Sequence, residues 1–105
     1  MIYRYDDDIL SLLRDRHTGA ENFVRSVEIE RSFDIKGVAV RQAVNRLRCN
    51  GQPVCSNADE YFYAKNANEI NDTITQLLGR TKKIIDAAQG FILSHQIFYD
   101  GRDGL

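Results

Sequence analysis

The stretch VAVRQAVNRLRCNGQPVCS, residues 38–56, changes from a helical to a β-strand pattern near a single glycine. Its apolar residues first follow the i, i+4, i+7 spacing of one buried helix face. They are Val40, Val44 and Leu47. Asn50 or Gly51 can take the left-handed conformation that ends a helix. A β-prone run follows at once, so the pattern predicts a helix over 37–49 that leads directly into a strand.

A second helical segment lies immediately upstream, in the octapeptide SVEIERSF. Ser26 is predicted as its N-cap, and Ile29 and Phe33 fall four residues apart on one face. The connection DIKG is short, with Asp34 as a turn former and Gly37 as the residue that supplies backbone freedom. The sequence therefore predicts two helices joined by a tight turn.

Downstream, QPVCS and EYFYAK are two β-prone runs joined by residues 57–59, which predicts a hairpin. Asn66 is predicted to cap a long last helix, with Glu69 at the N3 position of a capping-box-like pair. Upstream of the helix pair, YDDDILSLLRDR, residues 5–16, has acids at its start, arginines at its end and a helical apolar stripe. The run FVR then predicts a short strand.

The resulting order is helix, short strand, helix, tight turn, helix, hairpin, helix, which is the order of a winged helix-turn-helix. We expect an α+β, mostly helical fold in a single domain of 105 residues. Its core is expected over about residues 5–78, with a terminal helix and tail over about 67–105.

Several of these segments resemble the small winged-helix proteins of phages and prophages. That family combines a VR-x-x-V/I-N-x-LR helix with G-x-P-I/V-x-S, an aromatic strand and an E-I-x-x-T-I helix. The matching residues are Val40, Arg41, Val44, Asn45, Leu47, Arg48, Gly51, Pro53, Val54, Ser56, Tyr61, Phe62, Tyr63, Glu69, Ile70, Thr73 and Ile74. The resemblance covers about residues 9–92 and implies a winged helix with a DNA-binding role. Asp59 and Glu60 depart from a DNA-contacting wing, which would profit from Lys or Arg.

Charge restricts where nucleic acid could bind. The net charge is -1 and the pI about 6.1, which excludes a globally basic binder. Residues 25–52 hold six basic and three acidic groups, whereas the segments on both sides are net acidic. Any site for double-stranded DNA must therefore be a local patch in the middle third of the chain.

The candidate DNA-binding residues are polar groups on or beside the helix pair. They are Arg25, Ser26, Arg31, Lys36, Arg41, Gln42, Asn45 and Arg46. Arg can donate two hydrogen bonds to guanine, and Asn or Gln can pair with adenine. The alternative is a solvated helix face without a ligand. Arg41 and Arg48 are equally well explained as braces to the hairpin or last helix, through a carboxylate such as Glu69.

No catalytic or metal motif is found. Cys49 and Cys55 are too far apart for a zinc knuckle and lack a second pair, and three consecutive Asp residues, 6–8, suit a helix start better than a shared site. We expect no enzyme, no cofactor and no metal. No membrane span or signal segment is recognised, so a cytoplasmic protein of a bacterial host, with free thiols, is expected.

The last helix carries apolar residues alternately four and three apart, as in a heptad seam. They are Ile70, Ile74, Leu77, Thr81, Ile84, Ala88 and Phe91. The first three are expected to be mainly core. The second half extends beyond so small a core and predicts a homodimer interface. Its residues are Ile84, Ala88, Phe91, Ile92 and Phe98.

Two functions from different classes follow. The first is sequence-specific binding of double-stranded DNA, in transcriptional regulation or in phage replication control. The second is a protein-interaction module, for example a phage inhibitor of a host protein, which the near-neutral charge, acidic wing and apolar tail support. A scaffold that merely oligomerises has only the heptad-like seam behind it.

Overall fold

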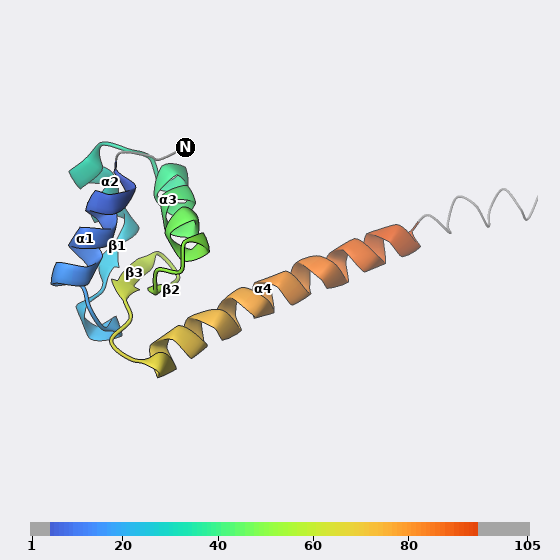
Figure 1. Ribbon diagram of the computed structural model, residues 1–105. Helices are drawn as coiled ribbons and strands as arrows, with labels where there is room; N and C mark the ends of the chain where they lie inside the picture. The colour runs from blue at the N-terminus through green and yellow to red at the C-terminus, as the bar shows by residue number, and fades with distance from the viewer. Residues whose placement is uncertain (1–4, 95–105) are drawn as a thin grey trace, which may run out of the picture. The chain divides into compact units, whose positions relative to one another are not determined.

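The computed structural model describes residues 5–94, which form an α+β fold with four α-helices and one three-stranded antiparallel sheet (Figure 1). The elements are α1 (Asp6–Arg16), the 3-10 helix η1 (Ala20–Asn22), β1 (Val24–Arg25), α2 (Ser26–Phe33), α3 (Gly37–Cys49), β2 (Val54–Asn57), β3 (Glu60–Tyr63) and α4 (Ala67–Leu93). This confirms the expected element order and the bounds of the helix over 37–49. The chain divides after Thr73 into an N-terminal unit and a second unit that begins at Ile74.

The sheet belongs to the N-terminal unit and has β3 at its centre, in the order β1-β3-β2. Val24 pairs with Tyr61 on one side of β3, and Cys55 pairs with Phe62 on the other. A two-residue turn joins β2 to β3, with Ala58 at a φ of 57°. The short strand predicted from FVR therefore closes the free edge of the hairpin.

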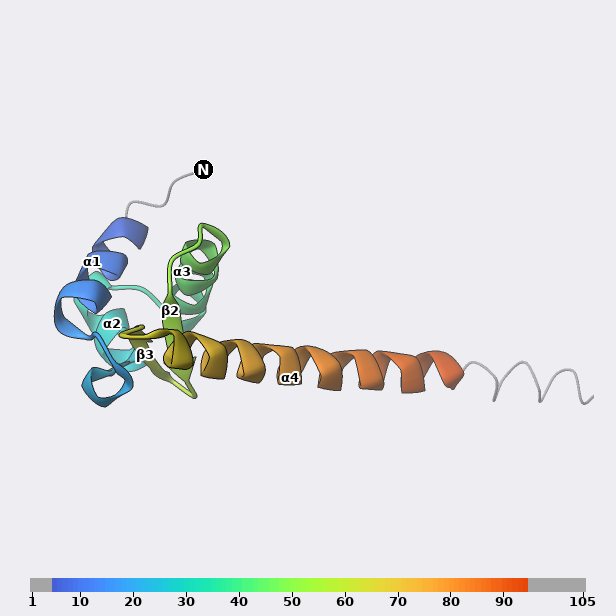
Figure 2. The same cartoon turned by 60° about the horizontal axis from the view of Figure 1, so that its bottom comes forward.

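The core of the N-terminal unit lies between the sheet and the first three helices, which gather together in both Figure 1 and Figure 2. Its fully buried aliphatic residues come from all three helices. They are Ile9, Leu13, Ile29, Val40 and Val44. Leu47 is 3% exposed, so the i, i+4, i+7 face predicted for α3 is confirmed.

The connection between α2 and α3 is three residues long, but two details differ from expectation. The left-handed residue is Asp34, at a φ of 53°, and Gly37 is an ordinary first residue of α3. Ser26 is the first residue of α2 rather than its N-cap. Its hydroxyl donates to Glu30 Oε2 over 3.0 Å, and its amide donates to the Asp59 carbonyl over 2.8 Å. The hairpin therefore caps α2, because the Asp59 carbonyl accepts the Ser26 N–H, one of the amides at a helix start that have no partner within the helix.

The start of α4 also differs from expectation. Ile70 and Ile74 were predicted to be core, yet they are 36% and 45% exposed, and Leu77 is only half-buried. Thr73 is the buried residue of this helix, at 6% exposure. The reason is that α4 is anchored through the Glu69–Thr73 face, where the Glu69 carbonyl accepts the Cys55 thiol at 3.5 Å.

No α-helix within residues 5–94 contains a segment both long and apolar enough to cross a membrane.

Candidate nucleic-acid interface

The exposed face of α3 is the centre of the candidate interface. Val40, Ala43, Val44 and Leu47 pack inward, so the residues between them in the helical repeat must point away from the core. These outward residues are Val38, Arg41, Gln42, Asn45 and Cys49, and all five are exposed. The face predicted for α3 is therefore confirmed as solvent-accessible, and it presents both hydrogen-bond donors and acceptors.

Five of the candidate DNA-binding side chains make no hydrogen bond or ion pair to any residue between 5 and 94. They are Arg31, Lys36, Arg41, Gln42 and Asn45. Three are cations and two are amides, so the group can serve both phosphates and base edges. A ligand could therefore bind these polar groups without first breaking a hydrogen bond or ion pair to a residue in this range.

Arg46, by contrast, is engaged with the first helix. Its Nε lies 2.7 Å from Asp6 Oδ2 and its Nη2 lies 2.9 Å from Asp6 Oδ1, a bidentate pair. The guanidinium also lies 6.0 Å from the ring centroid of Tyr5. The hydrogen bonds that Arg46 donates to Asp6 are the main cause of the raised pKa of Arg46. This side chain fastens α3 to the start of α1.

Arg48 braces the hairpin. Its Nε donates to the Val54 carbonyl and its Nη2 donates to Ser56 Oγ, both over 2.8 Å. Bracing was one of two alternatives for Arg48 and is the one observed, although the partner is β2 rather than Glu69. Arg41, the other candidate brace, has no such contact to a residue in the described range 5–94 and lies on the exposed face.

Arg25 and Ser26 are tied to the hairpin tip. Arg25 Nη1 lies 3.5 Å from Asp59 Oδ1 and Arg25 Nη2 lies 3.6 Å from Glu60 Oε2. Its guanidinium also stacks 5.4 Å from the Phe23 ring centroid. The two acids that weaken the tip as a phosphate contact are thus partly neutralised by Arg25, which leaves that arginine less available to a ligand.

A surface hollow separates this tip from α3. Ser26, Glu30, Arg41, Asp59 and Tyr61 are among its lining residues. A Cβ placed on Gly37 would meet Glu30 Oε2 at 3.5 Å and Arg41 Nη1 at 3.6 Å, so the missing side chain leaves space between these opposite charges. Arg41 therefore lies at the edge of α3 that faces the hairpin.

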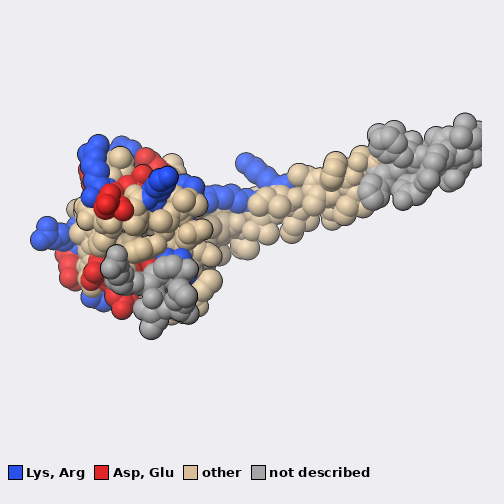
Figure 3. All heavy atoms as spheres, turned by 90° about the horizontal axis from the view of Figure 1, so that it is seen from above, with Lys and Arg blue, Asp and Glu red and all other residues tan. Residues whose placement is uncertain are grey.

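Charge on the surface is mixed rather than uniformly basic. On the face shown in Figure 3, the coloured Lys and Arg atoms of the N-terminal unit form separate groups among Asp and Glu atoms. This agrees with the net charge of -1. The unit therefore offers little long-range attraction to an anion, and an anionic ligand of α3 would have to be recognised by local contacts.

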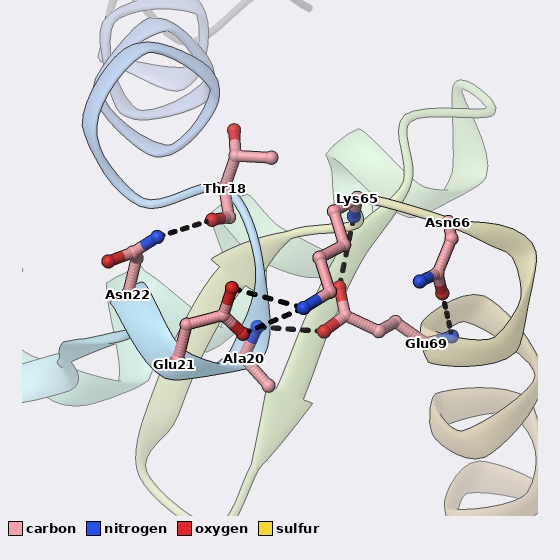
Figure 4. Close-up of polar contacts among 7 residues, drawn as sticks. All are labelled: Thr18, Ala20, Glu21, Asn22, Lys65, Asn66 and Glu69. Atoms are coloured by element: carbon pink, nitrogen blue, oxygen red, sulfur yellow. Dashed lines mark hydrogen bonds and ion pairs between the residues drawn. The ribbon is translucent and has the colours of Figure 1, made fainter.

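A polar junction links the loop after α1 to the start of α4 (Figure 4). Glu69 Oε2 accepts the Ala20 amide at 2.8 Å and Oε1 accepts the Lys65 amide at 2.9 Å. Lys65 Nζ lies 3.0 Å from both carboxylate oxygens of Glu21. A backbone hydrogen bond, followed by the Lys65 contact, lowers the pKa of Glu21, and the same contact raises the pKa of Lys65.

The sequence predicted only part of this junction. Asn66 Oδ1 accepts the Glu69 amide at 3.0 Å, as an N-cap should. The Glu69 carboxylate does not return the bond to Asn66 but reaches the loop at Ala20. No local sequence pattern predicts the contact between Glu69 and Ala20, because the two residues lie 49 positions apart.

Among residues 5–94, no cluster of three or more His, Cys, Asp or Glu side chains is arranged to hold a metal ion. Both cysteines are free, Cys49 exposed and Cys55 buried. Burial is the main cause of the raised pKa of Cys55.

The candidate partner-interface residues of α4 are exposed where they are described. Ile84 is 68%, Phe91 79% and Ile92 64% exposed, and Ala88 is exposed too. Phe98, the last of the predicted set, lies outside the described residues.

Comparison of the chain with protein-family models, with curated proteins and with solved structures finds no match.

Proposed function

We propose that this chain is a winged helix-turn-helix protein that binds double-stranded DNA through the exposed face of α3. The observation that carries the proposal is that Arg41, Gln42 and Asn45 share this face and have no hydrogen bond or ion pair to another side chain or backbone group within residues 5–94. Arg25, Arg46 and Arg48, by contrast, are engaged within the fold. Within the described part of the chain, the side chains best suited to base edges are thus the ones left without a pairing partner.

The arrangement of elements supports the winged-helix assignment. The three-residue connection between α2 and α3 is of the length found in helix-turn-helix motifs. The hairpin of β2 and β3 follows α3 directly and is held to it by Arg48. In such motifs the second helix enters the major groove with its N-terminal residues at the base edges, and Arg41 and Gln42 lie in the first half of α3.

Each side chain then has a distinct role. Arg41 would pair with guanine, and Gln42 and Asn45 with adenine, each good bidentate pair giving about 1–3 kcal/mol of discrimination between bases. Arg31 and Lys36 would contact phosphates, which fix the register without reading sequence. Arg46 and Arg25, included among the predicted contacts, would support the interface from within the fold.

The biological role that fits the phage-like sequence pattern is transcriptional regulation or replication control in the cytoplasm of a bacterial host. The sequence predicted a homodimer. Two copies related by a two-fold axis, whether alone or as half of a larger assembly, would present two α3 helices to a pseudo-palindromic site, with half-sites about one helical turn apart.

The test is fluorescence anisotropy of a labelled mixed-sequence duplex, titrated with the protein at low salt and again near physiological salt. We expect binding at low salt that weakens steeply with added salt, because phosphate contacts release counterions. The triple variant Arg41→Ala, Gln42→Ala, Asn45→Ala should lose binding. Arg16→Ala, which removes an exposed arginine from α1, is the matched control and should bind as the wild type does.

A second candidate is a protein-interaction module that does not bind DNA. The observation in its favour is the acidic hairpin tip, where Asp59 is exposed and Glu60 half-buried beside Arg25. A protein partner with a basic surface would suit this tip. Absence of duplex binding even at low salt would favour this candidate and remove the first.

A further inference from the structure

The sequence of α4 repeats with a period of seven residues from Thr73 to Leu93. Pairs of large apolar residues occur at positions 77–78, 84–85 and 91–92, and one further residue of the stripe lies three positions before each pair. These three residues are Ile74, Thr81 and Ala88. Three stripe positions in every seven is the pattern of a helix that faces the core of a bundle. Gly79 and Gly90 fall outside the stripe, so they do not interrupt it.

Within residues 5–94, most large side chains of the stripe are exposed. Among its large members, Leu78 is 63%, Ile84 68% and Phe91 79% exposed. At roughly 200 Å² for each large side chain, the exposed part of the stripe amounts to about 700 Å² per chain. Monomeric proteins rarely expose apolar patches much above a few hundred Å², whereas a stable interface needs about 800 Å² from each partner. The stripe therefore has nearly the area that self-association requires.

We infer that α4 assembles with the same helix of three other copies into a four-helix bundle. The number of copies is inferred from the width of the stripe. A two-stranded coiled coil needs only two apolar positions in seven, whereas Leu78, Ile85 and Ile92 add a third. In a pair of helices this third row would stay in water, and in a bundle of four it meets a second neighbour.

The occupant is another copy of this chain because the stripe is complementary to itself. A strict seven-residue repeat matches the spacing of knobs and holes on an identical helix. The charged residues of this segment all lie outside the stripe. They are Arg80, Lys82, Lys83 and Asp86. They therefore remain in solvent when copies pack together, and no charge has to be buried in the bundle.

The experiment is sedimentation equilibrium of the full chain without DNA. One chain weighs 12.0 kDa, so four copies should sediment at about 48 kDa. The variant Leu78→Gln, Ile85→Gln, Ile92→Gln narrows the stripe to two positions in seven and should sediment at about 24 kDa. The matched control Lys82→Gln, Lys83→Gln changes only the outer face and should stay at about 48 kDa.

A wild-type mass near 24 kDa would overturn the four-copy bundle, and a mass near 12 kDa would overturn self-association altogether. A 12 kDa species that binds anionic vesicles would assign the stripe to a lipid surface instead. Tyrosine fluorescence checks that the N-terminal unit is folded in each variant. The result is independent of the proposed function. The bundle can form in a protein that does not bind DNA, and α3 can bind DNA in a protein that does not form the bundle.

Discussion

Replacing Arg48 by Met tests whether the hairpin is held by the side chain that the structure assigns to it. Methionine keeps much of the length and apolar stem of arginine but cannot donate a hydrogen bond. The change removes the 2.8 Å bond to the Val54 carbonyl and the 2.8 Å bond to Ser56 Oγ. Both acceptors belong to buried residues, 2% and 6% exposed, so water replaces the lost donor poorly.

The expected cost follows from these two bonds. A hydrogen bond to a charged group contributes about 1.5–3 kcal/mol, and an acceptor left buried without a donor loses a similar amount. Because the two bonds share one guanidinium, their contributions are not additive. We expect Arg48→Met to lower the free energy of unfolding by about 2–4 kcal/mol. In a domain of this size that corresponds to a fall in Tm of roughly 10–25 °C.

Urea unfolding followed by tyrosine fluorescence measures this cost, because the chain has no tryptophan and most of its five tyrosines lie before Thr73. Arg48→Lys keeps the charge but can make at most one of the bonds in good geometry, so its loss should be intermediate. Arg31→Met is the matched control on the exposed surface and should unfold as the wild type does. A free energy of unfolding for Arg48→Met within about 0.5 kcal/mol of the wild-type value would refute the bracing role.

Three further predictions concern other parts of the N-terminal unit. Cys49 should react with a thiol reagent in the folded protein, while Cys55 should react only on unfolding, because burial both shields the Cys55 thiol and raises its pKa. Equal reaction rates of the two thiols in the folded protein would contradict the burial of Cys55. Leu13→Ala should lower the free energy of unfolding by about 3–5 kcal/mol in the same urea assay, since the side chain is 0% exposed; a loss below 1 kcal/mol would show that α1 is not part of the core. Glu69→Ala should speed hydrogen exchange at the Ala20 amide, which loses its acceptor, and unchanged exchange there would contradict the junction.

The parts of the fold that the sequence predicted well are those set by short-range periodicity. The helix over 37–49 was predicted with its observed bounds, because Val40, Val44 and Leu47 repeat at helical spacing and Gly51 ends it with a φ of 83°. The exposed face with Arg41 followed from the same pattern. Each of these inferences needs only neighbours within one or two turns of helix.

What the sequence did not predict depends on contacts between distant segments. Arg46 was assigned to DNA because it lies at the edge of the polar face, and its pairing with Asp6, 40 residues away, has no local signature. Ser26 was expected to be the N-cap of α2, but it is the first residue of that helix. Its own amide donates to the Asp59 carbonyl at the hairpin tip. The exposure of Ile70 likewise follows from the way Glu69 anchors α4, which the apolar seam alone could not reveal.

The division of arginines into exposed and engaged ones is tested most directly by the salt dependence of duplex binding. With Arg31 and Lys36 as the phosphate contacts of each chain, the log of the duplex-binding constant should fall with log salt at a slope of about -1.8 per bound chain, and Arg31→Ala should reduce the magnitude of that slope by about 0.9. Arg46→Gln, compared at a temperature where it is folded, should leave the slope unchanged because Asp6 already occupies its donors. An equal reduction by both variants, or a wild-type protein that does not bind the duplex, would contradict the account.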